Sequence, residues 1–162
     1  MMALHKLYMM LLAFCITLAG YSQNSQPETH LFVGSTPADS LIKSLLQIPA
    51  ADKAEFIKWE LNLPAGAVAG KFSFVAWYGE SQPNTNGFTS SSRKKITATG
   101  NYTTSHGTTY LPKATIFYLD AGNLSNKIVL VQLDGNVLHF ADSDKHLLAG
   151  NGGWGYVLNK EY

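Results

Sequence analysis

The amino-acid sequence predicts a mainly β protein: a small antiparallel β-barrel of about eight strands with one short helix. Groups of Gly, Pro, Asn and Asp, which favour turns, recur at short intervals from Pro64 onward. Runs of β-branched and aromatic residues lie between these turns, several with alternating apolar and polar positions. An open meander of this length would leave two unpaired edges, so closure into a barrel is the favoured arrangement.

The first two strands are expected at 30–34 and 57–63. Apolar residues occupy every second position of the latter, so Trp59 and its apolar neighbours should face the core while the polar residues face water. The last strand is expected at 154–159, and its Trp154 is also interpreted as a core anchor rather than a ligand platform.

Two middle segments, 72–78 and 114–119, are apolar at nearly every position, which predicts strands covered on both faces. Residues 128–140 read as a hairpin. Its expected turn, Asp134-Gly135, suits the positive φ angles of a tight primed turn.

One helix is expected between the first two strands. Pro37 would lie in its first turn, where the missing N–H costs nothing, and Pro49 would end it. The helix would have about three turns and pack on the sheet as a lid or plug. Its apolar face is expected to comprise Leu41, Ile42, Leu45, Leu46 and Ile48.

Residues 1–22 have the pattern of a secretory signal peptide. A basic start at Lys6 precedes an apolar run, and the small residues Gly20 and Ser22 suit a signal peptidase. We expect cleavage near Ser22-Gln23. The remaining residues, 23–162, would then form a single domain exported to the periplasm or the extracellular space.

The single cysteine, Cys15, lies inside this segment, so the exported protein would have no thiol for disulfides, metal sites or nucleophilic catalysis. Lipidation of Cys15 is the alternative, because Leu12-Ala13-Phe14-Cys15 has the outline of a lipobox, although Phe14 is larger than the usual small residue. The apolar run is shorter than the about 20 residues of a spanning helix, so no transmembrane segment is expected in the mature chain.

After residue 22 the chain has equal numbers of basic and acidic side chains, which argues against nucleic acid as a partner. The basic run Arg93-Lys94-Lys95 is interpreted as a solvated strand end that guards an edge. Motifs for a nucleophile, a phosphate loop or a dinucleotide site are missing from the sequence. We therefore expect no enzyme and no cofactor. The alternative is a hydrolase whose site is built from the loop residues Glu80, Asn84 and His106.

The segment 77–88 is the best candidate for a ligand site. Two aromatic residues at a strand end precede a polar loop, a combination that suits a small ligand held at a barrel mouth. The alternative is a long ordered loop that only covers the structure. The candidate residues are Trp77, Tyr78, Glu80, Gln82, Asn84 and Asn86.

The segment 139–146 is the best candidate for a metal site. It carries two imidazoles and two carboxylates, which would bind copper or a similar metal if the loop folds back. Lys145 adds an opposing charge, and a hairpin loop kept soluble by its charges is the alternative. The candidate ligands are His139, Asp142, Asp144 and His146.

Four segments together resemble the amino-terminal domain of NlpE-like envelope proteins. The resemblance implies a lipocalin-like barrel and a link to copper homeostasis and surface sensing. Segments 78–88 and 150–158 are also similar to a branch of secreted Bacteroidota proteins. The four segments are Gly34-Ser35-Thr36-Pro37-Ala38-Asp39, Trp59-Glu60-Leu61-Asn62-Leu63, Thr99-Gly100-Asn101-Tyr102 and Gly155-Tyr156-Val157-Leu158.

The chain departs from the family pattern at the thiols. Ala38 and Leu41 stand where the family has a Cys-x-x-Cys pair, and Gln23 stands where it has a lipidated cysteine. The resemblance therefore implies the barrel but not copper sensing by thiols.

Together these observations predict an exported, non-catalytic, monomeric barrel that binds a small ligand or an envelope protein. A metal homeostasis protein with His and carboxylate ligands is the first alternative. The loop-built hydrolase is the second.

Overall fold

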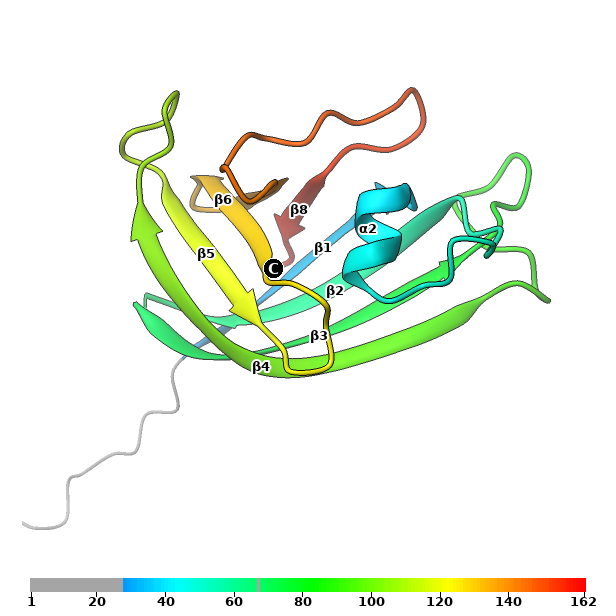
Figure 1. Ribbon diagram of the computed structural model, residues 1–162, viewed down its shortest axis with the longest axis horizontal. Helices are drawn as coiled ribbons and strands as arrows, with labels where there is room; N and C mark the ends of the chain where they lie inside the picture. Colours follow the sequence, from blue (N-terminus) through cyan, green and yellow to red (C-terminus); the bar gives the residue numbers. More distant parts are fainter. Residues whose placement is uncertain (1–27, 67) are drawn as a thin grey trace, which may run out of the picture.

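The computed structural model describes residues 28–66 and 68–162, and this part of the chain forms a closed antiparallel barrel of eight strands with one short helix (Figure 1). The predicted fold class is confirmed, while the expected signal peptide at 1–22 lies outside the described residues. Within the described residues, no helix is long and apolar enough to cross a membrane. The elements are β1 (Thr29–Pro37), α2 (Ser40–Leu45), β2 (Phe56–Pro64), β3 (Ala69–Gly79), β4 (Lys94–His106), β5 (Thr115–Asp120), β6 (Ile128–Asp134), β7 (Val137–Ala141) and β8 (Val157–Lys160).

Strand β1 closes the barrel by pairing with β2 on one side and with β8 on the other. At the seam, Gly34 lies opposite both Trp59 and Leu158. A Cβ atom on Gly34 would lie 2.2 Å from the carbonyl oxygen of Val157, so only glycine lets the strands approach this closely. Closure gives every strand two neighbours, although β5 pairs only with residues 101–106 of β4 and leaves residues 94–100 without a partner on that side.

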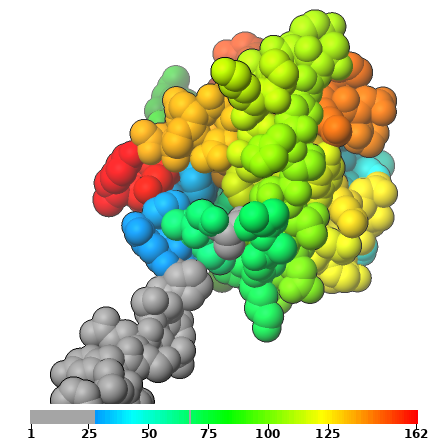
Figure 2. All heavy atoms as spheres, turned by 90° about the vertical axis from the view of Figure 1, so that its left-hand side faces the viewer, coloured from blue at the N-terminus to red at the C-terminus, as the bar shows by residue number. Residues whose placement is uncertain are grey.

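The connections between strands gather at the two ends of the barrel. The β2–β3 turn, the β4–β5 loop and the C-terminal residues lie at one end, which faces the viewer in Figure 2. The other end, which we call the mouth, carries α2 and the β3–β4, β5–β6 and β7–β8 loops (Figure 1).

Side chains fill the barrel interior. The Trp59 ring lies 5.4 Å from that of Phe74 and 5.1 Å from that of Phe140, centroid to centroid. Its Nε1 donates to Oγ1 of the fully buried Thr36 at 2.9 Å. The predicted alternation in β2 is confirmed, because its four inward residues are each at most 2% exposed. These residues are Ile57, Trp59, Leu61 and Leu63.

Helix α2 begins later than predicted. Pro37 is the last residue of β1, where it pairs with Phe56, and so does not lie in the helix. Asp39 caps the helix instead, because its Oδ1 accepts the N–H of Ile42 at 2.9 Å.

The helix also ends earlier than predicted. Gln47 adopts a left-handed φ of 55°, and the N–H of Ile48 donates to the carbonyl of Lys43 at 2.8 Å. This pattern ends a helix by satisfying its last carbonyls, so the helix stops before it reaches Pro49. Leu41 does not belong to the buried face, because it is 43% exposed. The other predicted members of that face are buried: Ile42, Leu45, Leu46 and Ile48.

Strand β5 is covered on both faces as predicted, but β3 is not. In β5, Leu119 packs inside the barrel and Ile116 packs outside it, and both are 0% exposed. In β3, the inward Phe74 is buried, whereas the outward Trp77 is only partly covered. The prediction of a second covered face is therefore wrong for β3, whose outer surface stays accessible.

Strands β6 and β7 form the predicted hairpin with a different turn. Asp134 pairs with Val137, so Gly135 and Asn136 make the turn, and neither has a positive φ angle. Oδ1 of Asp134 accepts the N–H of Asn136 at 2.7 Å, and a register shift before Asp134 provides the local twist.

Candidate ligand-binding site

A row of aromatic and cationic side chains crosses the outer faces of β2, β3 and β4. Trp77 of β3 lies opposite Lys58 of β2 and Lys95 of β4, and residues paired in this way share one face of the sheet. Lys95 Nζ and the guanidinium carbon of Arg93 each lie 4.9 Å from the centroid of the Trp77 ring. At this distance the ring attracts both cations.

Three stacked rings border this row on the side of the mouth. Phe56 points outward from β2, with the Phe88 ring at 4.3 Å and 12° and the Trp154 ring at 5.0 Å and 3°. Lys58 Nζ lies 5.8 Å from the Phe88 ring. The stack joins the β3–β4 loop to the β7–β8 loop across β2. Trp154 thus lies outside the barrel rather than within its core.

A tight turn fixes the position of Trp154. Oδ1 of Asn151 accepts the N–H groups of Gly153 and Trp154, both at 2.9 Å. The N–H of Asn151 donates to the Trp154 carbonyl at 3.0 Å. The ring is thereby held over Phe56 by its backbone as well as by stacking.

Two grooves meet at the aromatic and cationic row. The larger, of about 840 Å³, runs over β1 and β2, and the smaller, of about 580 Å³, lies beneath the β3–β4 loop. They share the lining residues Lys58, Glu60 and Trp77 and so adjoin each other, and we call the two together the outer groove. Either volume is typical of a small-molecule site. The larger is also lined by Ser35, Asn86 and Trp154, and the smaller by Gln82, Phe88 and Arg93.

The β3–β4 loop over the outer groove is held by hydrogen bonds. The N–H of Gln82 donates to the Gly87 carbonyl at 3.0 Å, and the N–H of Gly87 donates to Thr85 Oγ1 at 3.0 Å. The hydroxyl and the N–H of Ser81 both donate to Glu55, and these bonds lower the pKa of the Glu55 carboxyl. An ordered loop reduces the entropy that binding would cost.

The structure brings three of the six predicted ligand residues to the outer groove. Tyr78 faces the barrel interior, because neighbours in a strand point to opposite faces. Asn84 has a φ of 60° in the exposed part of the loop, and the N–H of Glu80 donates to Ser92 Oγ at 2.9 Å. Neither of these two lines the outer groove. The three that do are Trp77, Gln82 and Asn86.

Sequence reasoning missed the residues that surround Trp77. Lys58 and Glu60 were expected only to face water, which they do, but the strand register also sets them beside Trp77. The run 93–95 was interpreted as a solvated strand end that guards an edge. Strand β5 pairs only with residues 101–106 of β4, so Lys94 and Lys95 have a strand partner in β3 alone, and the register sets Lys95 opposite Trp77. The alternation within 57–63 was the signal that placed Lys58 and Glu60 on the outer face of their strand, whereas the uniformly basic run 93–95 carries no such pattern.

The residues proposed for a loop-built hydrolase do not converge. Glu80 and Asn84 belong to the β3–β4 loop at the mouth, whereas His106 ends β4 at the opposite end of the barrel. A strand of 13 residues separates the two ends by about 40 Å.

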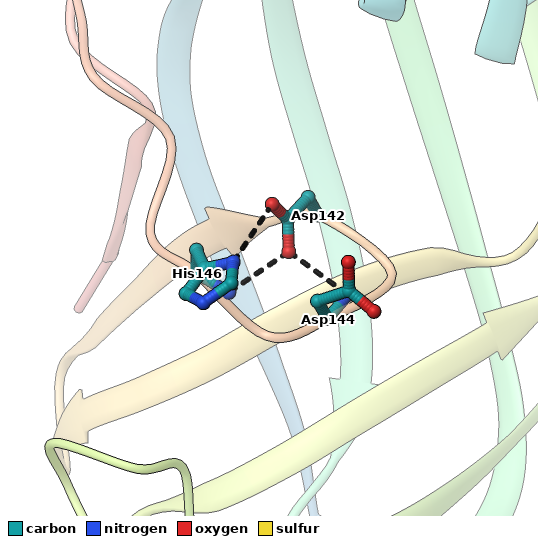
Figure 3. A group of neighbouring side chains, drawn as sticks. All are labelled: Asp142, Asp144 and His146. Atoms are coloured by element: carbon teal, nitrogen blue, oxygen red, sulfur yellow. Dashed lines mark hydrogen bonds and ion pairs between the residues drawn. The ribbon is translucent and has the colours of Figure 1, made fainter.

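Three of the four predicted metal ligands lie together in the loop after β7 (Figure 3). Asp142, Asp144 and His146 each offer one ligand atom, and these atoms lie within 4.8 Å of one another. His139 is not in this group: it lies on β7, with its Nδ1 2.8 Å from the Phe140 carbonyl oxygen.

Asp142 closes the turn that contains this group. Its Oδ1 accepts the N–H groups of Asp144 and His146, both at 2.9 Å, and its Oδ2 lies 3.2 Å from Nδ1 of His146. The backbone bond from His146 is the main reason why the pKa of the Asp142 carboxyl is lowered. A metal would compete with these bonds, so the geometry already has a structural explanation, and the metal site stays a prediction.

A third groove, of about 610 Å³, lies at the mouth beside α2. Its walls include Leu41, Ile128 and Leu148, and it suits an apolar rather than a polar ligand.

A comparison of the chain with protein families, curated proteins and solved structures found no match. The interpretation of the outer groove therefore rests on its geometry, and the resemblance to NlpE-like proteins stays a prediction.

Proposed function

We propose that this protein is a non-catalytic binding module that holds a chain-like, hydroxyl-rich ligand, such as an oligosaccharide, in the outer groove. The proposal rests on one observation: two adjoining grooves are both lined by Lys58, Glu60 and Trp77. Aromatic rings pack against the C–H faces of sugars, while amide, carboxylate and ammonium groups bond to their hydroxyls. The outer groove offers all of these groups.

The packed interior of the barrel supports a site on the outside. Trp59, Phe74 and Phe140 fill the space that a ligand inside the barrel would need. Export, as expected from residues 1–22, would bring the outer groove into contact with the sugars of a cell envelope or its surroundings.

Titration calorimetry with neutral and acidic oligosaccharides tests this function. Trp77→Ala removes the ring shared by both grooves, and we expect it to weaken binding by about tenfold or more. Tyr110→Ala is the matched control, because Tyr110 is 81% exposed in the β4–β5 loop and should not affect binding. Failure of every oligosaccharide to bind, or equal binding by Trp77→Ala, would contradict the proposal.

A further inference from the structure

The positive charge of the outer groove is concentrated at Trp77. Lys58, Arg93 and Lys95 come from β2, from the β3–β4 loop and from β4, and the strand register gathers them around this ring. Two of these cations lie 4.9 Å from the Trp77 centroid, and Lys58 lies 5.8 Å from the Phe88 ring. Like charges on neighbouring strands repel one another, so their gathering here opposes stability.

Among the residues that the structure describes, no carboxylate forms an ion pair with any of these three cations. The ion pairs in the described ranges 28–66 and 68–162 involve other side chains. Lys94 gives the contrast within the same run, because it points to the other face and lies 2.6 Å from Asp52. Lys94 thus has an acidic partner, whereas Arg93 and Lys95 each lie 4.9 Å from the centroid of the Trp77 ring.

The two acidic residues of the outer groove, Glu60 and Glu161, form no ion pair with these cations in the part of the chain that the structure describes. Glu60 is on the next outward row of β2, opposite Val75, and makes no ion pair with any of the three within the described residues. Glu161 follows β8 at the other end of the larger groove. A ligand with its negative charge at Trp77 and hydroxyls toward Glu60 would complement this distribution.

We propose that the outer groove selects an acidic sugar chain, with an anionic group of the sugar bound among Lys58, Arg93 and Lys95 while its ring packs on Trp77. This inference rests on the proposed function and specifies the charge of the ligand. Carboxylate and sulfate groups share the required chemistry, because both accept charge-assisted hydrogen bonds from ammonium and guanidinium groups.

The test compares acidic polymers with their neutral counterparts. Polygalacturonate is set against its methyl ester, and dextran sulfate against dextran, by affinity electrophoresis and calorimetry. We expect at least one acidic form to bind about tenfold more tightly than its neutral counterpart, and its affinity to fall steeply as NaCl rises from about 50 to about 500 mM. The polygalacturonate and dextran sulfate arms separate carboxylate from sulfate recognition.

Two triple variants with the same loss of charge make the test specific. Lys58→Gln, Arg93→Gln and Lys95→Gln together should abolish the preference for the acidic form. Lys53→Gln, Lys113→Gln and Lys127→Gln together should preserve it, because these exposed lysines lie outside the outer groove. Thermal unfolding shows whether each variant folds, and the three single substitutions replace the first triple variant if it does not.

Each outcome has a distinct meaning. Equal binding of acidic and neutral forms would overturn this inference while leaving the proposed function intact. Binding of none of the four polymers would overturn both. Equal weakening by the two triple variants would show general attraction to a polyanion and would also overturn the inference.

Discussion

The hydroxyl of Tyr156 donates a hydrogen bond to Oδ2 of Asp39, which lies 117 residues earlier in the chain. Oδ1 of the same carboxylate accepts the N–H of Ile42 at 2.9 Å and caps α2. The Tyr156 ring is 2% exposed and lies 6.4 Å from that of Phe140 in the core. The Asp39 carboxylate thus connects helix α2 at the mouth to Tyr156, the residue that precedes β8.

Removing this carboxylate should cost more stability than removing the hydroxyl. Asp39→Ala loses both the helix cap and the bond to Tyr156, and we expect it to lower the free energy of unfolding by about 1–3 kcal/mol. Tyr156→Phe keeps the ring and the cap, so its cost should be about 1 kcal/mol. Urea unfolding measures both, and a larger cost for Tyr156→Phe would contradict the shared role of Asp39.

Stability should fall at alkaline pH. Burial, followed by the bond to Asp39, raises the pKa of the Tyr156 hydroxyl. A tyrosine whose pKa is higher in the folded state stabilises the fold below its unfolded pKa of about 10, and this contribution is lost as pH rises toward the folded pKa.

Urea unfolding between about pH 8 and about pH 11 measures this effect. The free energy of unfolding should decline above about pH 10, and Tyr156→Phe should decline less steeply. Burial also raises the pKa of Tyr102, so part of the decline should remain in that variant. An identical decline in both proteins would show that Tyr156 does not contribute.

Substitution of Gly34 should break the barrel seam. A Cβ atom there would lie 2.2 Å from the Val157 carbonyl oxygen, so Gly34→Ala must push β1 away from β8 and should cost about 3 kcal/mol or more. Gly122→Ala is the control, because a Cβ there meets nothing within 4 Å and its φ is not positive. Similar melting temperatures for the two variants would contradict the close approach at the seam.

Two substitutions in the loop after β7 distinguish a purely structural turn from a metal site. In the presence of a chelator, Asp142→Ala should lower the free energy of unfolding because it loses the backbone bonds of Asp144 and His146. Asp144→Ala should change it by less than about 0.5 kcal/mol. Copper or zinc that raises the melting temperature of the wild type but not of Asp144→Ala would instead support the metal hypothesis.

The features predicted correctly from sequence are those that depend on local alternation. Every second residue from Ile57 to Leu63 is apolar, and these residues face the core because a strand sends alternate side chains to opposite faces. The helix ends were mispredicted because side-chain and backbone caps decided them. Asp39 and Gln47 set those ends, whereas the prolines at 37 and 49 were the more visible signals.

The candidate site was predicted only in part because it depends on register between strands. Trp77, Gln82 and Asn86 were found from one continuous segment. The pairing of Trp77 with Lys58 and Lys95 joins residues on three strands, and no local pattern specifies it. The segment 77–88 also suggested Tyr78 as a ligand residue, but Tyr78 and Trp77 are neighbours in β3, and their rings therefore lie on opposite faces of the strand.

The most direct test of the outer groove follows the three tryptophan indoles by ¹H–¹⁵N NMR during titration with an oligogalacturonate. All three tryptophans border the outer groove, but the Trp59 ring is buried in the core, packs on Phe74 and Phe140, and donates from Nε1 to Thr36. The account predicts shifts of the Trp77 and Trp154 indole signals and none of the Trp59 signal. A shift of the Trp59 signal alone, or no shift of any of the three indole signals at the highest ligand concentration, would contradict it.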